Sequence, residues 1–173
     1  MMMNRPVIVA VSGVKNSGKT TLITQMLPFF SATGLRTAVI KHDGHSFQPD
    51  PPDTDTGRFM AAGALGTAIF DGEICKVIRR QTVTEEALIA QFPEADLILL
   101  EGFKNSAWPK LELVRSGNSD CPVCSRGTLL ALVTDLPIDL PGVPCIPFGD
   151  AERAAAVILQ YRNRMGGINH EAD

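Results

Sequence analysis

Residues 7–22, VIVAVSGVKNSGKTTL, decide the fold of this chain. The first five are apolar and mostly β-branched, which is typical of a strand buried inside a parallel sheet. The run GVKNSGKT that follows fits the pattern G-x-x-x-x-G-K-[ST] without a mismatch. Gly13 and Gly18 allow backbone angles at which successive N–H groups converge on a phosphate, and the next helix turns its positive end toward that phosphate. In this pattern Lys19 reaches the outer phosphates of a nucleoside triphosphate and the Thr20 hydroxyl ligates Mg²⁺.

The composition is that of a globular protein. The chain has 173 residues, 45% of them hydrophobic and 20% charged, and a net charge of −3. We therefore expect no general attraction to nucleic acid. No apolar run approaches the roughly 20 residues that span a membrane. The N-terminal residues are too few and too polar for a signal peptide, so we expect a cytoplasmic protein with reduced cysteines.

Strand-like and helix-like patterns alternate along the chain. They predict an α/β protein with a three-layer phosphate-loop NTPase fold, in which a mostly parallel central sheet is flanked by helices, as one domain over 1–173. We expect strands over 7–11, 35–41, 67–71, 76–81, 97–100, 110–115, 129–134 and 145–148. We expect helices over 20–30, 57–63, 82–93 and 151–161. Pro28 should end or kink the first. A capping box of Thr82 and Glu85 should begin the third, and Asp150 should cap the fourth. The pattern of 97–100 is that of a central strand, whereas 110–115 alternates.

The segment 41–56, KHDGHSFQPDPPDTDT, has no periodicity. It leaves the second strand at the sheet edge that should carry the phosphate loop, where phosphate-loop enzymes place a mobile switch segment. Its candidate ligands are Asp53 and Asp55 on the metal side and, for phosphate or substrate, Lys41, His42 and His45. A solvated acidic loop with incidental histidines is the alternative.

Glu101 follows the central strand at its carboxyl end. A Walker-B acid at this position orients the Mg²⁺ shell or a nucleophilic water. Because a carboxylate buried there without a metal would be costly, the position favours a role in the site. Gly102 lets the backbone approach a γ-phosphate closely, and Lys104 can point back at it.

A polar insertion over 116–127 contains the pair Cys121 and Cys124. A CxxC pair supplies two of the four ligands that zinc usually takes, and Cys75 and Cys145 do not form a second pair. Zinc shared across a dimer, a redox pair and incidental reduced cysteines remain alternatives.

Taken together, the motifs resemble the molybdopterin-guanine dinucleotide biosynthesis protein B family. The resemblance covers residues 7–137 and is carried by GVKNSGKTTL, IKHDGH, DT ahead of AAGA, DLILLEGFK, PKLELVR and ALVTD, in that order. It implies a GTP-binding protein of the phosphate-loop class, typically a homodimer. Such a protein is an accessory to the enzyme that attaches GMP to molybdopterin. The CPVC insertion is outside the resemblance.

The resemblance also implies roles for single residues. The phosphates would be held by Gly13, Lys15, Asn16, Ser17, Gly18, Lys19, Thr20 and Thr21. The Mg²⁺ side would include Thr20, Asp55 and Glu101, and the γ-phosphate would lie near Gly102, Phe103 and Lys104. Asp135 ends the strand at which related GTPases recognise guanine, where a carboxylate accepts hydrogen bonds from N1–H and the exocyclic amine.

We therefore expect a GTP-binding accessory protein of molybdenum cofactor biosynthesis with slow Mg²⁺-dependent hydrolysis, its catalytic groups being Lys19, Glu101 and Lys104. Its expected partners are molybdenum cofactor guanylyltransferase, molybdopterin and a second copy of the chain. One rival is a metallochaperone GTPase, with metal ligands among His42, His45, Cys121 and Cys124. Another is a small-molecule kinase, although the sequence shows no Arg-rich lid.

Overall fold

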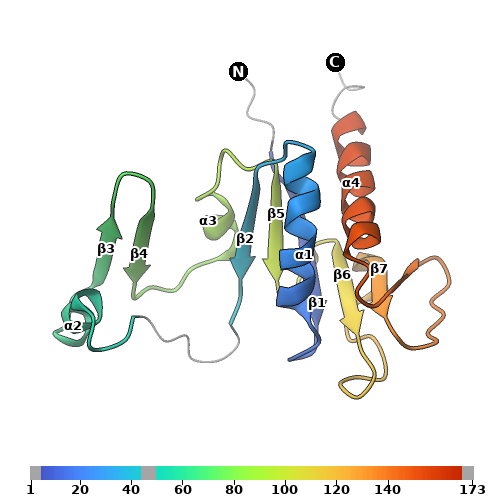
Figure 1. Cartoon of the computed structure of the whole chain (residues 1–173), viewed down its shortest axis with the longest axis horizontal. Coiled ribbons are helices and arrows are strands. Elements are labelled where there is room, and N and C mark those ends of the chain that lie inside the picture. The colour runs from blue at the N-terminus through green and yellow to red at the C-terminus, as the bar shows by residue number, and fades with distance from the viewer. Residues whose placement is uncertain (1–4, 44–49, 169–173) are drawn as a thin grey trace. The chain divides into compact units, whose positions relative to one another are not determined.

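The computed structural model describes residues 5–43 and 50–168. They form two compact units, one of residues up to 42 and from 88 onward, the other of residues 43–87 (Figure 1). The expectation of one domain over 1–173 stays a prediction. His45, one of the expected ligands, lies outside the described residues.

The larger unit is built on a six-stranded sheet in which every neighbouring pair of strands is parallel. The strand order is β2-β5-β1-β6-β7-β8. The strands are β1 Val7–Gly13, β2 Thr37–Lys41, β5 Leu97–Glu101, β6 Lys110–Val114, β7 Leu129–Thr134 and β8 Cys145–Pro147. The expected parallel sheet is confirmed. Since β1 lies between β5 and β6, the loops that follow these three strands share one edge of the sheet.

Helices cover both faces of this sheet. The long helices α1 Lys19–Ala32 and α4 Ala151–Ile168 pack side by side on one face (Figure 1). Leu97 and Leu99 of β5 face these helices, whereas Ile98 and Leu100 face the opposite side and pack with the segment that contains α3 Glu85–Ile89. This alternation buries all of β5, as its apolar run predicts. None of the helices within 5–43 and 50–168 is long and apolar enough to cross a membrane.

Two local expectations were wrong. Pro28 does not end α1, which continues to Ala32, because burial of the flanking Met26 and Phe30 offsets the roughly 3 kcal/mol that an internal proline costs. The helix expected over 82–93 covers only Glu85–Ile89 and is capped by Thr84, whose Oγ1 accepts from the Ala87 N–H at 3.2 Å.

Strand β6, expected over 110–115, is present, but the burial of its charged residues is not evident from its sequence. Its sequence, KLELV, alternates between charged and apolar residues, yet all five residues are buried, Lys110 and Glu112 included. The strand lies between β1 and β7, and the loops at the sheet edge cover the face on which the two charged side chains lie. A short 3₁₀ helix, Arg126–Thr128, precedes β7.

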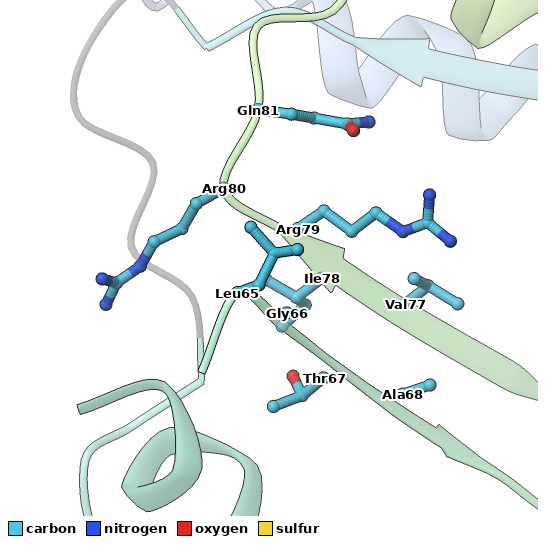
Figure 2. A pocket seen from close by; sticks show the side chains of 9 residues that line it. All are labelled: Leu65, Gly66, Thr67, Ala68, Val77, Ile78, Arg79, Arg80 and Gln81. Atoms are coloured by element: carbon cyan, nitrogen blue, oxygen red, sulfur yellow. The ribbon is translucent and has the colours of Figure 1, made fainter. Parts of the chain in front are cut away.

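The smaller unit contains α2 Asp55–Ala61 and an antiparallel hairpin of β3 Gly66–Phe70 and β4 Cys75–Arg79. Helix α2 begins inside the segment that we expected to be a loop, because Thr54 caps it by accepting a hydrogen bond from the Gly57 N–H at 3.1 Å. A hollow of about 470 Å³ lies against the hairpin and is lined by residues 65–68 and 77–81 (Figure 2). The side chains of Arg79, the last residue of β4, and of Arg80, which follows it, point in different directions, and the Arg80 guanidinium donates to the Met60 carbonyl.

Candidate functional site

The phosphate loop connects β1 to α1 and is shaped by residues with positive φ. Gly13 has φ +136°, and a Cβ there would lie 2.6 Å from the Leu113 carbonyl oxygen of the neighbouring strand β6. Any side chain would therefore push the loop away from the sheet. Asn16 also has a left-handed conformation, with φ 62°, and Gly18 follows with φ 95°. The sequence motif is thus folded as the tight turn that its glycines predict.

Lys19, the first residue of α1, folds back over this loop. Its ammonium group donates to the Val14 carbonyl at 2.6 Å and to the Gly13 carbonyl at 3.3 Å. Burial lowers the pKa of Lys19, and the nearby charges of Lys41 and Lys104 lower it further, while Glu101 acts in the opposite direction. Lys41 and Lys104, from two other segments, therefore lie near enough to Lys19 to act on it, and with one carboxylate among three lysines the site is electropositive.

Glu101 lies at the carboxyl end of β5, only 7% exposed. One oxygen of its carboxylate, Oε1, accepts from the Thr20 hydroxyl at 2.8 Å and lies 3.0 Å from the Lys41 ammonium. Strand register places Glu101 beside both Val11 of β1 and Lys41 of β2. The fold thus brings together a threonine and a glutamate that are 81 residues apart in sequence. A hydroxyl and a carboxylate are hard oxygen donors, so this pair fits Mg²⁺.

The turn after Glu101 has an unusual backbone. Gly102 has φ 104° and Phe103, which is not a glycine, has φ 49°. The Ser12 hydroxyl donates to the Gly102 carbonyl, and the Phe103 ring lies 5.5 Å from the ring of His42. These contacts join the turn to the ends of β1 and β2, the strands on either side of β5.

Asp135 follows β7 and accepts hydrogen bonds from Ser116, which follows the neighbouring strand β6. Its two carboxylate oxygens accept from the Ser116 N–H at 2.7 Å and from the Ser116 hydroxyl at 2.8 Å. These hydrogen bonds lower the pKa of the Asp135 carboxyl. Asp135 therefore holds the start of the 116–127 insertion, and its reading of a guanine base stays a prediction.

The insertion is anchored to the phosphate-loop side of the sheet. The buried Glu112 carboxylate accepts from the N–H groups of Val123 and Cys124, at 2.6 and 3.1 Å, and the Asn118 amide donates to the Lys15 carbonyl at 3.1 Å. Burial, and then the Glu112 carboxylate, raise the pKa of the Cys124 thiol to about 12. The described residues contain no group of three or more metal-binding side chains.

Not every expected site residue is in this unit. Asp53 lies in a turn and Asp55 begins α2, so both belong to the unit of residues 43–87. Conversely, two buried charged side chains at the same edge of the sheet were missed. Lys110 and Glu112 each bind a loop at the carboxyl edge of the sheet. The alternation of KLELV predicts a strand but does not say whether its charged face is buried, so the sequence carried no local signal for these two roles.

Comparison with known proteins gives consistent results. A family model described as "Molybdopterin guanine dinucleotide synthesis protein B" matches residues 8–135. The molybdopterin-guanine dinucleotide biosynthesis adapter protein of Escherichia coli (strain K12) is 30% identical over 170 residues, which cover 92% of this chain and 95% of that protein. The adapter protein of the same name from Haemophilus influenzae is 30% identical over 143 residues, covering 80% of each chain.

Solved structures are similar as well. The crystal structure of Bacillus subtilis MobB superposes with a TM-score of 0.73 at 31% identity, covering 89% of this chain and 96% of that one. A MobB homologue from Bacillus stearothermophilus gives a TM-score of 0.65 at 21% identity, over 91% and 98% of the two chains, and shows the same fold.

Proposed function

Because this chain belongs to the molybdopterin guanine dinucleotide synthesis protein B family, we propose that it is a GTP-binding adapter that assists the attachment of GMP to molybdopterin and hydrolyses GTP slowly. Its role in molybdopterin-guanine dinucleotide biosynthesis follows from family membership. The nucleotide, the hydrolysis and the partners are the proposal.

The observation that carries the proposal is the charge arrangement at the carboxyl edge of the sheet. Lys19 and Lys41 lie beside a single carboxylate, that of Glu101, and Lys104 lies near Lys19, next to a loop whose glycines let backbone N–H groups converge. An excess of positive charge next to such a loop suits a polyphosphate. A protein that bound a neutral ligand here would gain nothing from placing three ammonium groups together.

The residues of the site would have separate roles in binding the phosphates and the metal. The N–H groups of the loop and Lys19 would bind and orient the phosphates. Thr20 and Glu101 would hold Mg²⁺, which when bound neutralises charge on the phosphates. The Lys41 ammonium also lies against Oε1 of Glu101, so Lys41 would have to move partly away from this oxygen when Mg²⁺ binds. Asp55, from the unit of residues 43–87, remains a proposed third group on the metal side. The switch role proposed for residues 41–56 includes 44–49, which lie outside the described residues.

We propose the partners from the family and from one surface of the chain. The proposed protein partner is the molybdenum cofactor guanylyltransferase, in the cytoplasm, with molybdopterin as the acceptor of GMP. The exposed apolar side chains of the β3–β4 hairpin, among them Ile69, Phe70 and Ile74, supply a surface that a second copy of the chain could cover. We therefore propose a homodimer.

The test is a titration of the Lys19→Ala variant with GTP in the presence of Mg²⁺. Loss of a charge-assisted contact costs about 1.5–3 kcal/mol, so we expect affinity to fall by about ten- to over a hundredfold. Lys76→Ala, which removes the same charge from the exposed strand β4, is the matched control and should change affinity less than about twofold. Unchanged affinity in Lys19→Ala would remove the basis of the proposal.

Two measurements address the rival functions. Metal analysis of the purified protein would detect the zinc expected at Cys121 and Cys124 if the chain were a metallochaperone GTPase. Product analysis with labelled GTP and candidate acceptors would detect phosphoryl transfer by a small-molecule kinase. We expect neither bound zinc nor a phosphorylated acceptor.

A further inference from the structure

Lys110, the first residue of β6, is fully buried at 0% exposure. Its ammonium group donates to the carbonyls of Ser106, Phe103 and Lys104, at 2.7, 3.3 and 3.3 Å, and approaches the Ser106 hydroxyl at 3.5 Å. Taking a charged group out of water is costly unless it is fully hydrogen-bonded, and here the bonds converge on one short turn. The buried charge is therefore used to hold the turn 102–106.

This turn needs holding, because its backbone is not in a favoured conformation. Gly102 and Phe103 are consecutive residues with positive φ, and Phe103 is of a kind that rarely adopts it. Such a conformation persists only when its surroundings over-determine it. The Ser106 hydroxyl adds a further hydrogen bond to the Phe103 carbonyl at 2.8 Å. Lys110 thus donates to three carbonyls of the turn.

The turn carries a charge of its own toward the phosphate loop. The turn lies against the end of β1, where the phosphate loop begins, because the Ser12 hydroxyl donates to the Gly102 carbonyl and the Gly102 N–H donates to the Val11 carbonyl at 2.9 Å. Lys104 is two residues further along this turn. Lys19 is the residue that would reach the outer phosphates. The position of Lys104 relative to those phosphates is consequently set by the turn, and the turn is set by Lys110.

We propose that Lys110 is a positioning residue that gives the site its preference for a nucleoside triphosphate over a diphosphate, by holding the turn that presents Lys104 to the outermost phosphate. The inference rests on the proposed GTP binding and deepens it. The proposal does not extend to Glu112. Glu112 lies two residues along the same strand and is equally buried, but it anchors a different loop.

The experiment compares the affinities of GTP and GDP for the full chain and for two matched variants. Lys110→Met keeps the unbranched apolar stem and removes the ammonium group. We expect it to lower the affinity for GTP about tenfold or more, as for the loss of one charge-assisted contact, and to leave that for GDP within about twofold. Glu112→Gln removes the other buried charge of β6 and should leave the ratio of the two affinities unchanged.

Two further variants separate positioning from general damage. Ser106→Ala loosens the same turn at a partly exposed residue without burying or exposing a charge, so it should shift the ratio in the same direction by a smaller factor. In a double-mutant cycle, Lys104→Ala should have little additional effect on GTP affinity once Lys110→Met is present, because both remove the same contact. Additive effects, an unchanged ratio in Lys110→Met, or an equal change in Glu112→Gln would overturn the proposal.

Amide hydrogen exchange over residues 102–108 supplies a readout that does not depend on nucleotide. We expect these amides to exchange faster in Lys110→Met than in the parent chain, while those of 121–126 exchange faster only in Glu112→Gln. A parent chain that binds neither nucleotide would defeat the proposed function and the triphosphate preference. The exchange measurement would still decide whether Lys110 holds the turn, and equal exchange over 102–108 would show that it does not.

Discussion

The two units of this chain differ in how far their apolar side chains are buried. In the larger unit, called the sheet unit below, every residue of β5 is buried, and Leu97 to Leu100 are all fully covered. In the smaller unit, called the hairpin unit below, Leu65, Phe70 and Ile74 are 80, 78 and 70% exposed. Both stretches are rich in apolar residues, so composition alone does not explain the difference. A six-stranded sheet with helices on both faces can form its own core, whereas a two-stranded hairpin beside one short helix cannot.

The difference suggests a division of labour. Rigid parallel sheets place ligand sites at the carboxyl ends of their strands, and the electropositive site lies there. Contiguous exposed apolar patches, in contrast, mark surfaces that another protein covers. The sheet unit would then carry the nucleotide chemistry and the hairpin unit the assembly. The following predictions test this division, from the largest expected effect to the smallest.

The largest effect is expected from core truncation. Leu99→Ala should lower the free energy of unfolding by about 2–5 kcal/mol, because it leaves a cavity in the sheet core. Leu65→Ala, the same change at an exposed position of the hairpin unit, should change it by less than about 0.5 kcal/mol. Urea unfolding of the two variants at low protein concentration makes the measurement. A similar loss in both would mean that the hairpin unit has a core of its own.

The next effect concerns self-association. Changing Phe70 and Ile74 together to serine should weaken the proposed dimer at least about tenfold, since each apolar side chain gains roughly 1.5–3 kcal/mol on full burial. Sedimentation over a range of concentrations gives the dissociation constant. Val123→Ser, which changes an exposed apolar residue of the sheet unit, is the control. GTP affinity of the monomer should not change; a monomeric parent chain would contradict the assembly role.

Glu101→Gln should separate binding from turnover within the sheet unit. The amide keeps the shape of the side chain and an acceptor for the Thr20 hydroxyl, but removes the charge on the metal side. We expect nucleotide affinity within a few-fold of the parent and Mg²⁺-dependent single-turnover hydrolysis reduced about tenfold. Equal hydrolysis rates in variant and parent would make Glu101 a structural residue.

The smallest effect is expected at Asp135. If its carboxylate reads guanine despite its bonds to Ser116, Asp135→Asn should reduce the preference for GTP over ATP by a few-fold in a competition experiment. If ATP already competes equally with GTP in the parent chain, Asp135 is no base reader. Its function is then to hold the insertion beside the phosphate loop.

Much of the sheet unit could be predicted because its signals are local. The glycines of the phosphate loop specify a turn by their own conformational freedom, and the apolar run before Glu101 specifies a central strand by its pattern. The same locality explains why Asp150 was correctly identified as a helix cap: its carboxylate accepts from the Arg153 N–H three residues later. Such features need no knowledge of distant parts of the chain.

Sequence by itself therefore determined the phosphate loop, the strands and the acid at the end of the central strand. Only the tertiary structure decided that Lys110 and Glu112 are buried, that Thr20 donates to Glu101, and that both carboxylate oxygens of Asp135 bind Ser116. The physical reason is that burial of a charge depends on which loops fold over the sheet edge. Those loops come from other parts of the sequence, so an alternating charged strand has the same local pattern whether its charges face water or hold a turn.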